Sequence, residues 1–175
     1  MSQLDWGELL ATAHFSALHL EMRDTYSVGD ERGPFDHWLA TGEADTDPES
    51  PMWSGWTRTV RDTISRGVIM RRARVVSEPV TDYIRYEHAG TGVNLAAGEL
   101  VRWLPRSRAS DLCLPGNDFW LLDDHTVVFN LFNGAGDWGN PANEIRKEAA
   151  VVKLCTTAFE SVWERATDHE EYRIR

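Results

Sequence analysis

Hydrophobic positions follow two different periods along the chain. In three stretches apolar side chains recur every three or four residues, the spacing that places them on one face of an α-helix. This spacing predicts helices over Leu4–Val28, Met52–Ser65 and Glu148–Ala166. A further short element over 34–39 follows the glycine-containing break at 29–33.

Between the second and the last of these helices the period changes to two, as in a β-strand whose side chains alternate between two faces. Strands are predicted over Val68–Ser77, Ala97–Leu104, Asn117–Leu122 and Thr126–Phe132. Asp82–His88 fits either a strand or a turn of helix. Only the turn at 123–125 separates the last two strands, which predicts a hairpin.

Helices at both ends with strands between them predict an α+β fold, or an α/β fold if the strands prove parallel. We expect a single central mixed β-sheet of about five strands, flanked by the N-terminal and C-terminal helices. The length of 175 residues suits one globular domain over residues 1–175. Two segments interrupt the pattern: an acidic loop at 40–51, expected to be mobile, and a glycine-rich loop at 133–141 that presents Trp138 as an interface anchor or a lid.

Charge is distributed unevenly along the chain. The net charge is −10, yet the segment Arg58–Arg108 holds ten arginines against five acidic residues. Crowded guanidinium groups repel one another unless anions or an acidic surface meet them, so this segment is a candidate recognition site. The overall acidity argues against direct binding along DNA.

The sequence predicts a cytoplasmic protein without membrane contact. No apolar run is long enough to cross a membrane, and the first residues have neither a basic start nor an apolar stretch. No spacing of His, Cys, Asp or Glu matches a metal-binding motif, and no phosphate-binding or dinucleotide motif is present, so neither a metal nor another cofactor is expected.

Alternation along the first central strand places Arg72 and Arg74 on one side and Arg71 on the other. If Arg74, Arg85 and Arg102 line one face of the sheet, their forked guanidinium groups form a site for a carboxylate, a phosphate or an acidic peptide. The candidates for binding a ligand or partner are Arg71, Arg72, Arg74, Arg85, Arg102, Trp103, Arg106, Trp120 and Trp138. In the alternative, the arginines form an internal network with Glu21, Asp24, Glu78, Asp82, Glu87 and Glu99.

Four residues are candidates for catalysis: His19, Glu21 and Asp24 on the predicted first helix, and Asp118 at the start of a strand. Two carboxylates and an imidazole suit acid–base chemistry. Their spacing matches neither of the helical metal motifs HxxxH and HExxH. The alternative roles are ion pairing for the helix residues and turn formation for Asp118.

Several motifs occur in an order that is typical of one family. They are His19–Tyr26, Arg71–Pro79, Asp82–Tyr86, Ala97–Arg106, Leu114–Trp120 and Phe159–Ala166. Over nearly its whole length the chain thereby resembles an actinomycete family known as domain of unknown function 6879. The resemblance implies no particular activity. It implies a context, that of small accessory proteins encoded near helix-turn-helix regulators in sporulating, antibiotic-producing bacteria.

The second half is also similar to phospholipase-D-like sensor domains. The similarity rests on the strand at 101–104, on the strand and hairpin that begin at 118–123, and on the helix ending at Phe159–Ala166. Enzymes of that fold need a His-x-Lys pair followed by an Asp, with His as nucleophile and Lys on phosphate. No histidine of this chain is followed two residues later by lysine, so the resemblance implies the fold without the catalysis.

These features predict a non-enzymatic accessory or regulatory protein. We expect it to bind a protein partner, a helix-turn-helix transcriptional regulator, or a small anionic ligand through the arginine-rich face of the sheet, with exposed tryptophans as apolar anchors. The alternative is an enzyme of the phosphodiesterase or nuclease class that uses His19, Glu21, Asp24 or Asp118 beside the arginines.

Overall fold

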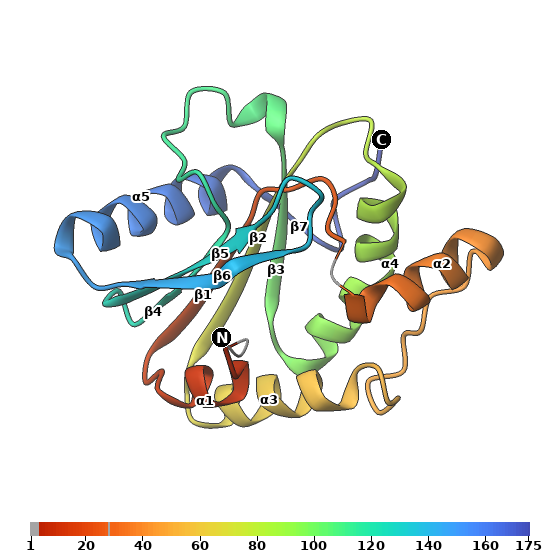
Figure 1. Ribbon diagram of the computed structural model, residues 1–175, viewed down its shortest axis with the longest axis horizontal. Coiled ribbons are helices and arrows are strands. Elements are labelled where there is room, and N and C mark those ends of the chain that lie inside the picture. Colours follow the sequence, from red (N-terminus) through yellow and green to blue (C-terminus); the bar gives the residue numbers. More distant parts are fainter. Residues whose placement is uncertain (1–3, 28) are drawn as a thin grey trace.

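The computed structural model describes residues 4–27 and 29–175. Within them, seven strands form one sheet in the order β6-β5-β4-β1-β2-β3-β7 (Figure 1). The strands are β1 Ser16–Glu21, β2 Ile69–Val76, β3 Leu100–Pro105, β4 Phe119–Leu122, β5 Thr126–Phe132, β6 Trp138–Arg146 and β7 Thr167–Asp168. The helices are α1 Trp6–Ala11, α2 Gly29–Thr41, α3 Ser54–Ser65, α4 Asp82–Ala97 and α5 Ala149–Arg165, and a short 3₁₀-helix, η1 Arg106–Arg108, follows β3.

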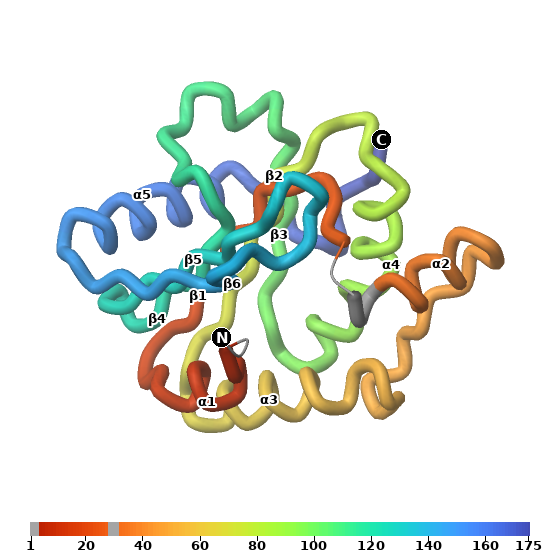
Figure 2. Tube along the Cα trace, in the orientation of Figure 1, coloured from red at the N-terminus to blue at the C-terminus, as the bar shows by residue number. Residues whose placement is uncertain are grey.

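The centre of the sheet is parallel and its sides are antiparallel. β1, β2 and β3 run in the same direction, β4 pairs antiparallel with β1, and β5, β6 and β7 also pair antiparallel with their neighbours. The predicted α+β class with one mixed sheet is confirmed, although the described strands number seven and not five. The carboxyl ends of β1, β2 and β3 reach the same edge of the sheet, beside which the C-terminal segment lies (Figures 1 and 2).

Helices cover both faces of the sheet. α5 packs on one face, where its Phe159 joins a core cluster with Leu20 and Val75. We call this the α5 face. On the other face, α1 and α3 pack over Ala17 and its neighbours, and α4 packs beside Trp103; this is the α3–α4 face. None of the helices in the described ranges has the length and apolar character that a membrane span requires.

The predicted helix over Leu4–Val28 is wrong. Helix α1 covers only Trp6–Ala11, and the chain then enters β1, the strand between β4 and β2. Val28 itself lies outside the described residues. The apolar residues of Ser16–Glu21 fitted a helical spacing, but they alternate between two covered faces, so nearly all of them are buried.

The segment Asp82–His88 is helical and opens the long helix α4. Thr81 caps this helix, since its hydroxyl accepts a hydrogen bond from the amide of Ile84 at 3.2 Å. Gly98 ends it with a φ of 103°, a left-handed conformation that glycine adopts without strain. The strand predicted over Ala97–Leu104 therefore begins at Leu100 and not at Ala97.

The glycine-rich loop predicted at 133–141 is shorter than expected. Trp138–Pro141 already belongs to β6, which forms one edge of the sheet. Because this edge strand has no fully buried face, its sequence lacks the apolar alternation that would have predicted it. Of the acidic loop predicted at 40–51, residues 40 and 41 belong to the end of α2. The remaining residues continue in turns towards α3.

Candidate functional site

A buried ionic network crosses the α3–α4 face of the sheet. Arg72 and Arg74 of β2 are both less than one tenth exposed. Arg72 donates from Nη1 to Glu21 Oε1 at 2.6 Å and from Nε to Glu99 Oε1 at 2.9 Å. Arg74 lies 2.6 Å from Glu21 and 2.5 Å from Glu87. We call these five side chains the ionic belt.

The position of the belt follows from the strand register. Glu21 is paired with Arg74 in the β1–β2 ladder, and His19 is paired with Arg72. Because side chains alternate along a strand, these four point to the same face. Helix α4 and the residue after Gly98 then supply two further carboxylates, so the arginines are neutralised from within the fold.

Electrostatics keeps the centre of the belt ionised. Burial opposes the charge on Glu21, but Arg74 and Arg72 outweigh it and lower the pKa of Glu21 to about 2. Burial likewise opposes the charge on the two arginines, while Glu99 and Glu21 raise the pKa of Arg72, and Glu21 and Glu87 raise that of Arg74. Arginine is effectively always protonated, so Glu21 and both guanidinium groups are charged at neutral pH.

Tryptophan rings cover the two buried guanidinium groups. The Arg74 guanidinium carbon lies 5.0 Å from the ring centroid of Trp103, and that of Arg72 lies 5.8 Å from the rings of both Trp56 and Trp120. Such cation–π contacts strengthen when they are removed from water. Together with the ion pairs they explain how two adjacent arginines can be buried.

His19 borders the belt as a neutral imidazole. Its ring stacks on Trp120 with centroids 4.2 Å apart. Burial lowers its pKa to about 3, although Glu21 opposes this shift, and Arg72 and Arg74 lower the pKa further. Nδ1 lies 3.4 Å from Glu21 Oε1, yet within the described chain neither ring nitrogen has a hydrogen-bond partner.

The sequence suggested that Arg74, Arg85 and Arg102 could line one face of the sheet. The structure separates these three arginines. Ladder pairing of Ala73 with Arg102 and of Arg74 with Trp103 puts Arg102 on the α5 face, where it donates to Asp168 at 2.7 Å. Arg85 lies on α4 and not on a strand. The alternative internal network is confirmed for five acids, each within 4.0 Å of an arginine: Glu21, Asp24, Asp82, Glu87 and Glu99.

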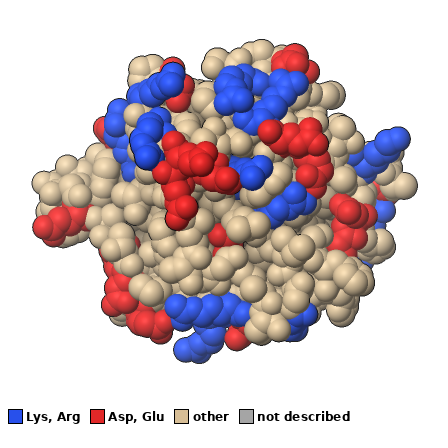
Figure 3. All heavy atoms as spheres, turned by 180° about the vertical axis from the view of Figure 1, so that it is seen from behind, with Lys and Arg blue, Asp and Glu red and all other residues tan. Residues whose placement is uncertain are grey.

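The remaining candidates have different surroundings. Arg71 points to the α5 face and pairs with Glu160 at 2.5 Å. Trp103 and Trp120 are 0% and 3% exposed, so the expectation that they form exposed anchors is wrong. Trp138 is half-buried and stacks on Phe132, with centroids 4.7 Å apart. On the face drawn in Figure 3, basic side chains form separate groups with acidic ones between them, and not one continuous basic surface.

A pocket of about 340 Å³ opens at the edge where the parallel strands end. It is lined by residues after β1, in η1, in the segment 114–118 and at the end of β5. We call it the Asp118 pocket. It brings together Arg106 and Asp118, two residues singled out in the sequence for different reasons. In open sheets with parallel strands, the carboxyl ends of the strands are a common place for ligands.

Asp118 forms the buried acid of this pocket. The residue is 2% exposed, and its carboxylate accepts hydrogen bonds from the amide of Met22 at 2.8 Å and from the hydroxyl of Tyr26. Burial raises its pKa to about 6, although the hydrogen bond from Tyr26 lowers it, and the nearby Glu21 raises it further. The charge of Asp118 therefore changes close to neutral pH.

Two arginines of the pocket are held in different ways. Arg106 donates from Nη2 to the carbonyl oxygens of Met22 and Val75 and from Nε to the hydroxyl of Ser77. Arg23 packs its guanidinium 5.1 Å from the ring centroid of Phe132. Its Nε is buried without a hydrogen-bond partner in the described part of the chain. Arg106 is thus fixed by the main chain, whereas Arg23 retains a free donor.

The four catalytic candidates do not converge on one site. His19 and Glu21 lie at the belt, and Asp24 accepts hydrogen bonds from the amide and hydroxyl of Ser77. Of the four, only Asp118 lines the pocket. Among residues 4–27 and 29–175, no group of three or more His, Cys, Asp or Glu is arranged to hold a metal ion.

Arg23 lines the pocket, although its residue type and position in the sequence had not marked it as a site residue. The signal was present, since Arg23 lies two residues after the segment Ser16–Glu21, which could have been interpreted as a buried strand. Polar residues just after a parallel strand are candidates for ligand binding. The helical interpretation of this segment concealed them.

Comparison with known proteins supports the fold. The profile of a family described as domain of unknown function (DUF6879) matches residues 4–174. In sequence, the chain matches no protein of curated function. Among solved structures it is similar to Nuc, a phospholipase D family member from Salmonella typhimurium, with a TM-score of 0.53 and 12% identity over 95% of this chain and 88% of that one.

A second structure belongs to TrmBL2, an archaeal chromatin protein described with a novel mode of DNA binding. Its TM-score is 0.48 at 17% identity over 92% of this chain, but this chain spans only 48% of that protein. At 12% identity the likeness to Nuc concerns the fold alone. The similarity to Nuc agrees with the phospholipase-D-like fold expected from the second half of the sequence.

Proposed function

Since the chain belongs to the family described as domain of unknown function (DUF6879), we propose that it is a non-enzymatic regulatory domain that binds a small organic anion in the Asp118 pocket. The observation that carries this proposal is the meeting of Arg23, Arg106 and the buried Asp118 in one pocket at the carboxyl edge of the parallel strands. Family membership itself supplies no activity.

The lining of the pocket favours an organic anion. Met22, Leu114 and Phe132 provide apolar walls, and Arg23, which has no carboxylate within 4.0 Å in the described chain, provides the charge that attracts an anion. The volume of about 340 Å³ suits a small metabolite. A carboxylate is the group that best fits the fork of an arginine, because both of its oxygens can accept hydrogen bonds.

Binding is favoured over catalysis by the residues available. The pocket lining contains two arginines, an aspartate and an asparagine as polar side chains, and its described members include no imidazole, thiol or hydroxyl. His19 and Glu21 lie in or beside the ionic belt, where ion pairs and stacking hold them. The rival phosphodiesterase function would need them to reach a substrate in the pocket.

The proposed partner is a DNA-binding regulator of the helix-turn-helix class, and the contact differs from that expected from the sequence. The two arginines and three glutamates of the ionic belt contribute −1, so the rest of the chain carries −9 of the total charge of −10. An acidic surface favours association with a basic partner surface. We therefore propose that the regulator presents basic residues, and that the ligand state of the Asp118 pocket modulates its binding.

The ligand is tested by thermal unfolding with a panel of small hydroxy acids, among them lactate, tartrate and gluconate. A binding anion raises the unfolding temperature in a saturable way. The variant Arg23→Gln should lose this response, whereas Arg58→Gln, an equal charge change at an exposed position on α3, should keep it. A response that persists in Arg23→Gln would move the ligand out of this pocket.

The partner is tested separately by capture from a lysate of the source cells at low and high salt. Salt-sensitive recovery of a DNA-binding protein is expected, because contacts between charged surfaces weaken as ionic strength rises. Recovery of no DNA-binding protein by a well-folded bait would refute the partner while leaving the ligand pocket standing.

A further inference from the structure

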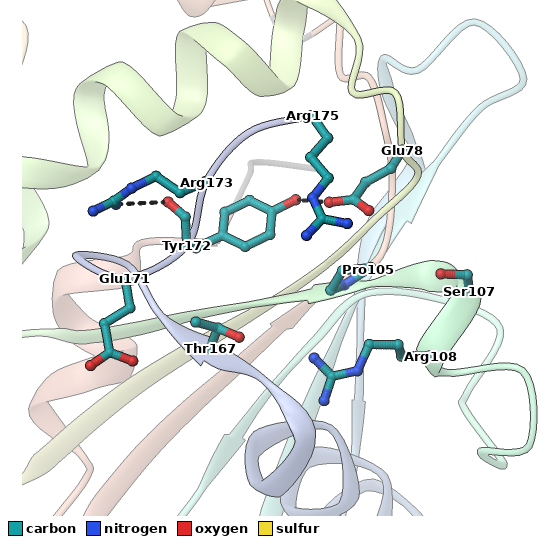
Figure 4. Close-up of a pocket in the computed structure, with 9 residues that line it drawn as sticks. All are labelled: Glu78, Pro105, Ser107, Arg108, Thr167, Glu171, Tyr172, Arg173 and Arg175. Atoms are coloured by element: carbon teal, nitrogen blue, oxygen red, sulfur yellow. Dashed lines mark hydrogen bonds between the residues drawn. The ribbon is translucent and has the colours of Figure 1, made fainter.

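A second cavity at the same edge of the sheet lies on the other side of η1. Its volume is about 300 Å³. Ser107 and Arg108 of η1 line one side, and the last segment of the chain, with Tyr172 and Arg175, lines the other (Figure 4). We call it the Arg108 pocket. Glu78, Pro105, Ser107 and Arg108 fall inside the arginine-rich segment Arg58–Arg108, but the sequence analysis named none of the lining residues as a ligand-binding candidate.

The arginines of this cavity are distinguished by their lack of acidic partners. Of the sixteen arginines, ten lie within 4.0 Å of a carboxylate in the described chain. Three of the other six, Arg108, Arg173 and Arg175, line this one cavity. In a protein with a charge of −10, such a gathering of unpaired guanidinium groups is a signature of anion binding.

The three arginines have distinct roles. Arg173 donates to the carbonyl oxygens of Glu170 and Tyr172, which ties it to its own segment and turns it away from the others (Figure 4). Arg108 and Arg175 extend towards the cavity from different elements (Figure 4). Two cations facing one space repel each other unless an anion lies between them.

The two acids of the lining leave room for that anion. Glu78 accepts a hydrogen bond from the Tyr172 hydroxyl at 2.9 Å, which orients its carboxylate. Glu171 lies on the far side of the cavity from Arg108 (Figure 4). With three arginines and two glutamates the lining keeps a net positive charge.

We infer that the Arg108 pocket binds a phosphate group, held between Arg108 and Arg175 with the hydroxyl of Ser107 as a further donor. A phosphate offers more oxygens than a carboxylate, so two guanidinium forks and a hydroxyl can bind it at once. This site is separate from the Asp118 pocket and does not depend on the function proposed for it.

The test is an NMR titration of the ¹⁵N-labelled protein with inorganic phosphate at constant ionic strength. Saturable shifts are expected for the amides of Ser107, Thr167 and Tyr172. Arg108→Gln and Arg175→Gln should each weaken binding about tenfold, the effect of losing a charge-assisted hydrogen bond. Arg58→Gln removes a charge elsewhere on the surface and should leave the affinity unchanged.

Three results would overturn the inference. Shifts confined to Arg23, Asn117 and Asp118 would assign phosphate to the other pocket. Equal affinity in Arg108→Gln and Arg58→Gln would show a diffuse charge effect, and shifts that never saturate would show no site. Arg108 is exposed, so its variant should fold, which the dispersion of the same spectra checks directly.

Discussion

Glu21 and Arg74 lie side by side on two parallel strands, with Oε2 of the glutamate 2.6 Å from Nε of the arginine, and both side chains are at most 14% exposed. The pair could not be replaced one partner at a time without leaving a buried charge. Arg72, the other arginine of the ionic belt, also contacts Glu21. The arginine-rich segment that looked like a recognition surface in the sequence therefore serves first as a structural element of the sheet.

Replacing Arg74 should destabilise the protein strongly. Arg74→Met leaves Glu21 and Glu87 close together with one cation fewer, and breaking a buried ion pair from one side typically costs about 3–5 kcal/mol. Urea denaturation measures the loss. Arg58→Met on the exposed side of α3 is the matched control and should change stability by less than about 0.5 kcal/mol. Equal stability of the two variants would mean that the belt contributes nothing to folding.

His19 and His169 should titrate at lower pH in the folded protein than in the unfolded chain. Burial lowers the pKa of His19 to about 3 and that of His169 to about 4. Both rings should thus stay neutral on acidification from pH 8 to about pH 5, whereas in urea they titrate near 6.5. NMR of ¹³C-labelled histidine tests this. A His19 ring that titrates near neutrality in the folded protein would contradict its placement beside Arg72 and Arg74.

Removing the charge of Asp118 should stabilise the protein at alkaline pH. The folded pKa of about 6 exceeds the ordinary value of 3.8, so the folded state binds more protons than the unfolded state between these values. Asp118 thus makes stability fall as pH rises through this window. Asp118→Asn should be more stable than the wild type at pH 8 by about 1–3 kcal/mol, and the difference should vanish near pH 4.

Urea denaturation at both pH values measures this difference. The control is Asp62→Asn, the same chemical change at an exposed position of α3, which should change stability by less than about 0.5 kcal/mol. A destabilised Asp118→Asn variant at pH 8 would show that the hydrogen bonds from Met22 and Tyr26 require the ionised carboxylate.

The sequence predicted the hairpin of β4 and β5 from the tight turn at 123–125 between two apolar runs, and it predicted the helix α5 from apolar residues that recur on the one face packed against the core. It failed at Ser16–Glu21, where both faces are buried and the apolar spacing no longer distinguishes strand from helix. That one error hid the strand between β2 and β4, and with it the register that pairs Glu21 with Arg74.

Prediction of the site from the sequence is limited by the unknown order of the strands. Arg106 and Asp118 could be singled out by residue type, but their meeting with Arg23 depends on which strands end at the same edge. Strand order cannot be derived from spacing along one chain. The internal pairing of the arginines could be formulated from charge alone, and alternation separated Arg71 from Arg74, whereas the placement of Arg102 on the face opposite to Arg74 required the ladder of Arg74 with Trp103.

Binding of an organic anion in the Asp118 pocket should strengthen as pH falls. With a pKa of about 6, Asp118 is mainly ionised at pH 8 and mainly protonated at about pH 5.5, so its repulsion of an anion disappears over this range. At the effective dielectric constant of a partly buried site, one nearby charge changes affinity by about tenfold or more. Calorimetry with lactate or tartrate measures the change, because both stay ionised at the two pH values.

Two variants separate this effect from a general titration of the surface. Asp118→Asn should bind at pH 8 about as tightly as the wild type binds at pH 5.5, and its affinity should no longer depend on pH in this range. Arg23→Gln should weaken binding at both values, since Arg23 supplies attraction and not the titrating group. If Asp118→Asn kept the pH dependence of the wild type, a group outside the pocket would be responsible, and the buried acid would have no part in recognising the ligand.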